Sequence, residues 1–277
     1  MKLHLSSLTV IALSACGDGG SGDSDEGSPD SDPVTYVQIF DATSTETSEL
    51  SGHELPSGST TLGLLAGTLD RSADRATVGA LSGDINALRT QIDLDGGGII
   101  TLDELSTAYV TTFTSQPNAG IPSIGVIGIP TAAGDMPTTG TVTLYADSAG
   151  SSIQIIDGSA VYDLTGAVSA EVVFNSNDVD LVFENLNGTR STGVAAPQPV
   201  SDVATITIDD ASIAGSVFTG GTATFASTEI TSTLSGTQTV QTSGGFFGPE
   251  ADEIGGVFII DDTTGATLLI QGTFIVD

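Results

Sequence analysis

The sequence predicts an all-β protein: a soluble antiparallel barrel of roughly eight strands, preceded by a smaller β-rich domain. Apolar and polar residues alternate along many short runs, which is typical of strands with one buried face. Threonine, valine and glycine dominate these runs, and strong helix formers are scarce. The second half of the chain holds about eight such runs, and eight strands can close a barrel that side chains fill.

The first residues predict a bacterial lipoprotein. Residues 1–15 contain Lys2, then an apolar run to Leu13, and this pattern is typical of a secretory signal peptide. The run Leu13-Ser-Ala-Cys16 resembles a lipobox, in which the cysteine is acylated and becomes the mature N-terminus. Cys16 is the only cysteine, so we predict that it is the lipid attachment residue and that the chain has no internal disulfide.

Residues 16–33 predict a lipidated cysteine followed by a disordered acidic tether. Nearly all of these residues are Gly, Ser, Asp, Glu or Pro, which are too polar to bury a core. Gly17 follows the cysteine directly. In enterobacterial lipoproteins, an aspartate at this position retains the protein at the inner membrane, and this chain lacks it. We therefore expect a lipid anchor in the cell outer membrane, with display at the cell surface as a further expectation.

Residues 34–135 predict the smaller β-rich domain. A helical turn is expected only at Ser82–Arg89, and the boundary with the next domain is expected near Gly134–Pro137. The predicted strands are short runs separated by turn residues: Val34–Asp41, Thr61–Leu69, Ala76–Leu81, Tyr109–Thr114 and Ile124–Ile129.

One stretch of this domain has two interpretations. Asp93, Asp95 and Glu104 occupy positions 1, 3 and 12 of the calcium-loop template, which makes them candidate calcium ligands. Against a metal site, position 5 is Gly97, and the following residues are typical of a strand. The same residues can form a β-hairpin with one apolar face and a glycine turn, and we favour this hairpin over the calcium loop.

Residues 136–277 predict the barrel itself. In the last run, Ala266, Leu268, Ile270, Gly272, Phe274 and Val276 share one face, and Thr267, Gln271, Thr273 and Asp277 share the other. A transmembrane barrel is the alternative, but it requires girdles of aromatic residues. The chain has no tryptophan and only 5% aromatic residues, so a soluble barrel is favoured.

The most distinctive stretch is Gly244–Phe258, which we call the signature segment. Its Gly248-Pro249 step is turn chemistry, so we predict a strand that ends at Phe247 and another that opens at Gly255. Its glycine pairs predict a close approach of backbone or rings. The residues to which we assign this structural role are Gly245, Phe246, Phe247, Gly248, Pro249, Ala251, Glu253, Gly255, Gly256 and Phe258.

The signature segment resembles that of the transferrin-binding protein B family of bacterial surface lipoproteins, whose barrels carry a similar G-x-F-F/Y-G-P-x-A-x-E-x-G-G-x-F run. Ala251 and Glu253 fall on the A-x-E positions. The resemblance extends from Met136 to Asp277 through Pro137–Gly140, Ile213–Phe218 and Gly272–Phe274. It implies a barrel beside a smaller "handle" domain, and a binding protein that passes iron carriers to an outer-membrane transporter.

Composition excludes several classes of function. Thirty-five acidic residues oppose five basic ones, for a net charge of −30, so nucleic acid and anionic lipid are unfavourable partners. The acids are scattered, which favours solvation in a salty habitat over recognition of a basic ligand. His53 is the one histidine beyond the signal peptide, and we expect it to be solvated in a loop. We predict no catalytic residues, no enzyme and no cofactor.

Two functions follow. The first is a binding module that captures a protein, haem or metal-bearing solute and works with an outer-membrane transporter. We expect this module to bind its ligand through loops of residues 34–134. The second is a structural or adhesive surface lipoprotein without a transported ligand. Calcium binding through residues 93–104 is a minor alternative.

Overall fold

A computed structural model of the chain describes residues 35–87, 89–102, 107–234, 238–262 and 268–277. The predicted signal peptide, Cys16, the tether and Glu104 lie outside these residues. Within them, regular structure is almost entirely antiparallel β-sheet, and a 3₁₀ turn at Pro249–Ala251 is the one helical element. No helical segment in this part of the chain has the length and hydropathy needed to cross a bilayer.

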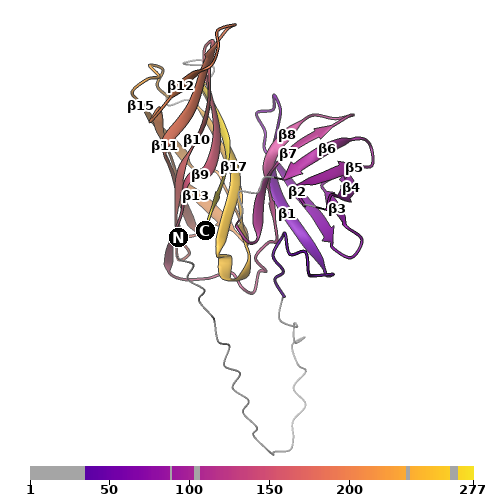
Figure 1. Cartoon of the computed structure of the whole chain (residues 1–277). Coiled ribbons are helices and arrows are strands. Elements are labelled where there is room, and N and C mark those ends of the chain that lie inside the picture. Colours follow the sequence, from indigo (N-terminus) through magenta and orange to yellow (C-terminus); the bar gives the residue numbers. More distant parts are fainter. Residues whose placement is uncertain (1–34, 88, 103–106, 235–237, 263–267) are drawn as a thin grey trace, which may run out of the picture. The chain divides into compact units, whose positions relative to one another are not determined.

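The first eight strands close into a barrel of their own, which we call the first barrel (Figure 1). Each strand pairs with the next, and β1 pairs with β8 to complete the ring. The strands are β1 Thr47–Pro56, β2 Gly63–Asp70, β3 Arg75–Val78, β4 Leu81–Ile85, β5 Gln91–Leu94, β6 Gly98–Leu102, β7 Val110–Pro117 and β8 Ser123–Gly128. The smaller β-rich domain is therefore a closed barrel.

Predictions of secondary structure in this region are wrong at three places. At Ala76–Leu81 the predicted strand is divided between β3 and β4, which pair with each other. The described part of Val34–Asp41 is not a strand, because the guanidinium of buried Arg71 takes its carbonyl groups: Arg71 Nη2 donates to the carbonyl oxygen of Gln38 at 2.9 Å. The first half of the expected helical turn at Ser82–Arg89 belongs to strand β4. Gly83 pairs with Leu94 of β5, and this sheet pairing outweighs the local preference.

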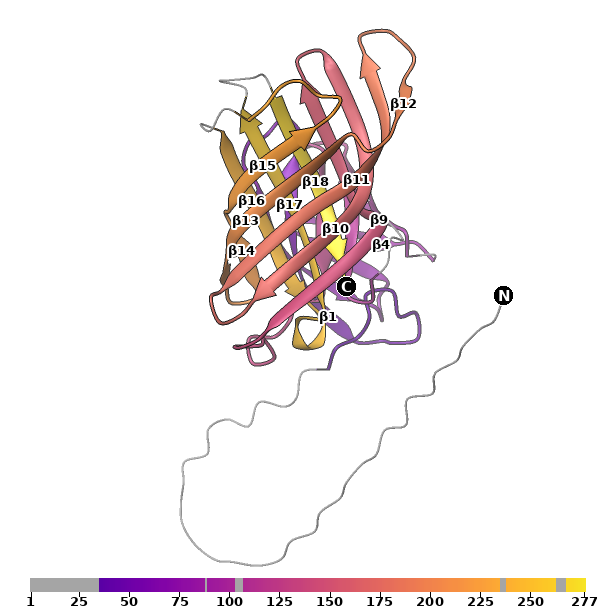
Figure 2. The same cartoon turned by 90° about the vertical axis from the view of Figure 1, so that its left-hand side faces the viewer.

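The next ten strands form one sheet, in which the pairing of β11 with β13 closes eight of them into the second barrel (Figure 2). Strands β12 and β15 lie outside that ring. The strands are β9 Thr141–Asp157, β10 Ala160–Val173, β11 Asp178–Thr192, β12 Gln198–Val200, β13 Ala204–Ala214, β14 Val217–Thr219, β15 Thr222–Ser227, β16 Thr239–Phe247, β17 Glu253–Asp262 and β18 Leu268–Val276. The predicted eight-stranded antiparallel barrel is confirmed.

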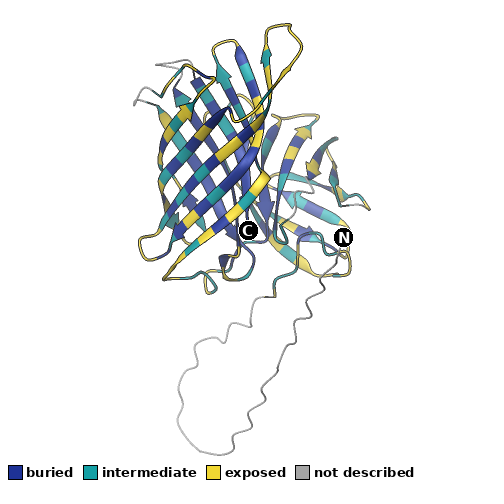
Figure 3. Cartoon of the chain, turned by 60° about the vertical axis from the view of Figure 1, so that its left-hand side comes forward, coloured by how far each residue is buried: buried dark blue, intermediate teal, exposed yellow. Residues whose placement is uncertain are grey.

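Phenylalanines fill the second barrel. The ring of Phe183 lies 4.8 Å from that of Phe258 and 5.5 Å from that of Phe274, measured between centroids. Buried and exposed residues alternate along the strands (Figure 3), as the sequence predicted. The interior is a packed apolar core rather than a ligand cavity.

Strand β18 departs from this alternation. Thr273 and Ile275 lie on its outer face, yet they are only 4% and 5% exposed. The first barrel covers this face: Ile275 packs with Val110, Val126 and Phe247, and Leu55 packs with Val257 and Ile259. The outer walls of β17 and β18 are therefore a second buried surface, which joins the two barrels.

Candidate functional site

The residues that match the calcium-loop template form a β-hairpin, which is the interpretation that the sequence favours. Strands β5 and β6 pair directly, with Ile92 opposite Ile100. The carboxylate of Asp95 accepts hydrogen bonds from Arg75 at 2.5 Å and from Ser82 at 2.8 Å. Asp93 accepts one from the side chain of Gln91. Asp95 therefore serves an ion pair on the barrel surface, whereas Glu104 lies outside the described residues.

The glycine pairs of the signature segment make room for aromatic rings. Gly244 faces Gly256 across the β16–β17 hairpin. A Cβ atom on Gly256 would lie 2.8 Å from Cζ of Phe274 and 2.9 Å from the Cα of Gly244. Phe246 and Phe258 are buried in the core of the second barrel. The predicted close approach is thus present, and it is an approach of rings and backbone within the barrel.

The turn of the signature segment contacts the first barrel. β16 ends at Phe247, as predicted, and β17 begins at Glu253, two residues before the predicted start at Gly255. Gly248 has a φ of 75°, a backbone conformation that glycine adopts without strain, and Tyr109 of the first barrel lies against it. The backbone N–H of Gly248 donates to the carbonyl oxygen of Ile129 at 3.0 Å.

Glu253 links the two barrels through several hydrogen bonds. Its carboxylate accepts backbone N–H groups from three consecutive residues at the start of β7: Ala108 at 2.6 Å, Tyr109 at 2.8 Å and Val110 at 3.1 Å. Burial raises the pKa of Glu253, and these backbone donors oppose the rise. Glu253 of the signature segment therefore fixes the first barrel to the second.

His53 lies at the same junction, and the prediction of a solvated loop residue is wrong. It belongs to β1 and is 1% exposed. Its Nδ1 atom is hydrogen-bonded to Oγ of Ser243 at 2.8 Å. Its Nε2 has no partner among the described residues. Burial lowers the pKa of His53 to about 4, so the imidazole is neutral at pH 7. His53 shares one face of β1 with buried Leu55 two residues later, and this spacing is the one signal in the sequence for its position.

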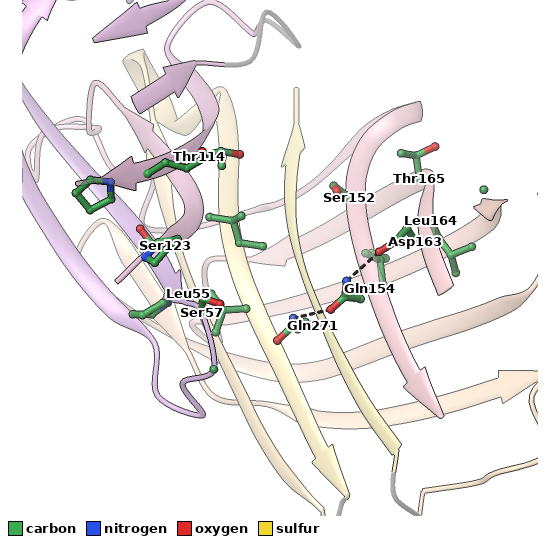
Figure 4. A pocket seen from close by; sticks show the side chains of 18 of the residues that line it. Leu55, Ser57, Thr114, Ser123, Ser152, Gln154, Asp163, Leu164, Thr165 and Gln271 are labelled. Atoms are coloured by element: carbon green, nitrogen blue, oxygen red, sulfur yellow. Dashed lines mark hydrogen bonds between the residues drawn. The ribbon is translucent and has the colours of Figure 1, made fainter. Parts of the chain in front are cut away.

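Beside this junction the two barrels form a groove of about 620 Å³ (Figure 4). The wall from the first barrel comes from the end of β1, from β7 and from the start of β8, and it is rich in apolar side chains. The wall from the second barrel comes from β9, β10, β11 and β18. No local pattern in the sequence indicates the groove, because its residues come from segments as far apart as Leu55 and Gln271.

The wall from the second barrel presents amide and hydroxyl groups. Figure 4 shows a row in which Gln271 Nε2 donates to Gln154 Oε1 at 3.1 Å and Gln154 Nε2 donates to Asp163 Oδ1 at 2.9 Å. Ser152 and Thr165 flank this row and are exposed. Asp163 is the one ionisable side chain among the lining residues that the structure describes.

A loop of the first barrel borders the groove. Pro117 and Pro122 line the groove from the two ends of the β7–β8 loop, and Ile121 between them is 66% exposed. The backbone N–H of Ser57 donates to the carbonyl oxygen of Pro122 at 2.7 Å, which ties this loop to the end of β1. A large exposed apolar side chain on a tethered loop is suited to contact with another protein.

Comparison with known proteins identifies relatives. A family model described as the C-lobe and N-lobe β-barrels of Tf-binding protein B matches residues 136–275. A comparison with curated proteins finds no match.

Solved structures share the fold. A double mutant of transferrin-binding protein B from Haemophilus parasuis Hp5 is 18% identical, with a TM-score of 0.54, over 82% of this chain and 44% of that one. The intact Ap-TbpB, with N and C lobes, is 18% identical, with a TM-score of 0.51, over 82% of this chain and 45% of that one. This chain therefore spans less than half the length of these relatives.

Proposed function

The chain belongs to the family of transferrin-binding protein B β-barrels, and we propose that it is an outer-membrane lipoprotein that binds a protein ligand in the groove between its two barrels. The family is one of binding proteins rather than enzymes. The transferrin-binding relatives are longer than this chain, so the identity of its ligand rests on the chemistry of its own surface.

The groove lining carries the proposal. It combines apolar side chains with neutral amide and hydroxyl groups, which pair well with the backbone and side chains of a polypeptide loop. Haem iron is held by His, Cys, Met or Tyr, and none of these residue types is among the described residues that line the groove. Haem propionates and anionic metal chelates would also lack a cationic partner there. Of the three ligand classes, a protein fits best.

Charge narrows the class of protein. The one ionisable residue in the described lining of the groove, Asp163, is acidic, and the whole chain carries a net charge of −30. A ligand surface that is neutral or basic at the contact therefore meets attraction rather than repulsion. We also propose that the protein passes this ligand, or the cargo of the ligand, to an outer-membrane transporter. This part of the proposal rests on the family resemblance alone.

The test is recovery of the ligand from native cells. We would isolate the lipoprotein in mild detergent and identify co-purifying proteins by mass spectrometry, for wild type, Asp163→Arg and Asp93→Arg. Asp163→Arg places a long cation in the groove, whereas Asp93→Arg makes the same charge change on β5, across the first barrel from β1. We expect Asp163→Arg alone to lose the protein. Equal loss in both variants, or in neither, would contradict the assignment of the groove.

A structural or adhesive lipoprotein is the second candidate, because apolar side chains pack the interiors of both barrels in the part of the chain that the structure describes. Repeated failure to recover any protein from wild-type cells, under conditions in which the lipoprotein itself is recovered, would favour this function.

Anchoring through Cys16 is tested separately. Because durable membrane attachment depends on acyl chains, Cys16→Ser should release or misroute the protein. Partition into the detergent phase as complete as that of wild type would contradict lipidation. The outcome does not depend on the groove, so the anchor and the binding site can fail independently.

A further inference from the structure

The first part of β9 is an open strand edge. β9 pairs with β10 along nearly its whole length, but it pairs with β18 only from Ser151 to Asp157. The residues between Ala146 and Ser151 are skipped in the pairing with β10, so they form a bulge that separates the two parts of the strand. Among the described residues, no strand pairs with Thr141–Leu144 on the side away from β10.

The backbone groups on this edge can be assigned. The N–H of Tyr145 donates to the carbonyl oxygen of Asp277 at 3.2 Å, so the backbone of Tyr145 faces away from β10. Backbone direction alternates along a strand, and the N–H and C=O of one residue point to the same side. Thr143 and Thr141 therefore also direct their N–H and C=O groups outward.

This edge lacks the usual protection against pairing. Natural edge strands carry lysine, proline or inward charges, whereas Thr141–Tyr145 reads Thr-Val-Thr-Leu-Tyr, all good strand formers. Tyr145 is 51% exposed. A hollow of about 270 Å³ lies beside the edge, and Leu144, Phe174 and Ala251 give it an apolar lining. The edge thus offers both hydrogen bonds and a place for a side chain.

The surroundings of the edge are acidic. Glu250 and Asp252 line the hollow, and exposed Glu171 lies opposite Thr143 on β10. The basic residues of the described chain are elsewhere: Arg71, Arg75 and Arg89 belong to the first barrel, and Arg190 is stacked on Tyr162. An occupant with a lysine or arginine beside its strand would therefore be attracted, and a second copy of this acidic chain would be repelled.

We propose that the Thr141–Tyr145 edge binds an extended, basic segment of another protein by strand addition. The segment would exchange backbone hydrogen bonds with Thr141 and Thr143, place an apolar side chain in the hollow, and set a cation near Glu250 and Asp252. Only an extended polypeptide supplies alternating donors and acceptors at this spacing. The Thr141–Tyr145 edge is separate from the groove, so the proposal of strand addition does not depend on the proposed function.

A labelled peptide tests the proposal on the full mature lipoprotein in nonionic detergent. The probe is the end-capped peptide Lys-Val-Thr-Val-Thr-Val-Lys, measured by fluorescence anisotropy, with two controls: the same peptide N-methylated at alternate residues, and one with Glu in place of Lys. We expect micromolar binding, reduced at least about tenfold in both controls, since methylation removes donors and Glu meets acidic residues.

Protein variants locate the contact. Thr143→Pro removes the outward N–H and leaves the pairing with β10 in place, because proline is tolerated on an edge. Thr143→Ala is the matched control, since it keeps that N–H. We expect Thr143→Pro to weaken binding at least about tenfold and Thr143→Ala to leave it within about twofold. If Thr143→Pro does not fold, amide hydrogen exchange in wild type decides: the peptide should protect the N–H of Thr143.

Three results would overturn the proposal. The first is equal binding of the methylated peptide. The second is peptide binding without protection of the Thr143 amide. The third is protection of that amide in the protein alone, with sedimentation as a dimer, which would make the occupant of the edge a second copy of the chain.

Discussion

His53 is buried at the contact of the two barrels, and its burial sets a pH dependence. Its pKa is about 4 in the folded chain, against an ordinary value of 6.5. Between these values the unfolded chain binds a proton that the folded chain does not, so stability falls as the pH is lowered from 6.5 to 4. Each pKa unit corresponds to about 1.4 kcal/mol, so the loss is about 3 kcal/mol.

Urea denaturation at pH 7 and pH 4 measures this loss. Carboxylates also titrate in this range, so wild type is compared with His53→Gln, in which the imidazole is absent. We expect the free energy of unfolding of wild type to drop by about 3 kcal/mol more than that of the variant. Parallel pH profiles for the two proteins would show that His53 is not buried as the structure has it.

Gly256 is a second position at which one residue controls the packing. A side chain there would collide with the ring of Phe274 and with the backbone of Gly244, which has no room to move between β14 and β17. Gly256→Val should therefore cost several kcal/mol of unfolding free energy, at the upper end for a point change. Gly134→Val is the matched control, because nothing lies within 4 Å of a Cβ on Gly134. A melting temperature of Gly256→Val within a degree or two of the wild-type value would contradict the contact with the ring of Phe274.

At the scale of elements, the β5–β6 hairpin gives a prediction on calcium. Asp95 is held by Arg75 and Ser82, and its pKa is lowered first by the hydrogen bond from Arg75. Millimolar calcium should therefore shift the melting temperature no more than magnesium does. A calcium-selective shift that Asp93→Ala abolishes would establish the metal site instead.

The elements also show where sequence patterns carry information. The alternation in β18 predicts its interior face correctly, because Leu268, Ile270 and Phe274 meet one core. The same alternation assigns Thr273 to solvent, and this is wrong because the first barrel covers it. Similarly, Gly220 and Gly221, both with positive φ, separate the short strand β14 from β15. The alternation of apolar and polar residues along a strand shows that the strand has two faces, but it does not show which part of the molecule covers each face.

At the scale of the whole molecule, the second barrel could be predicted from its strand count and its signature segment, but the junction could not. Closure of the first barrel depends on β3, β4 and β5, which are four or five residues long and too short to show a clear period. The contact of Glu253 with Ala108–Val110 and the groove beside it join segments more than 100 residues apart. Nothing local in the sequence specifies either one.

The central claim is that a protein ligand occupies the groove between the barrels. Hydrogen exchange of the native lipoprotein, with and without the protein that co-purifies with it, tests this claim most directly. The account predicts slower exchange at Leu55–Gly58, along the exposed part of the β7–β8 loop and at Ser152–Gln154. Protection confined to other surfaces of the chain, with these segments unchanged, would contradict it.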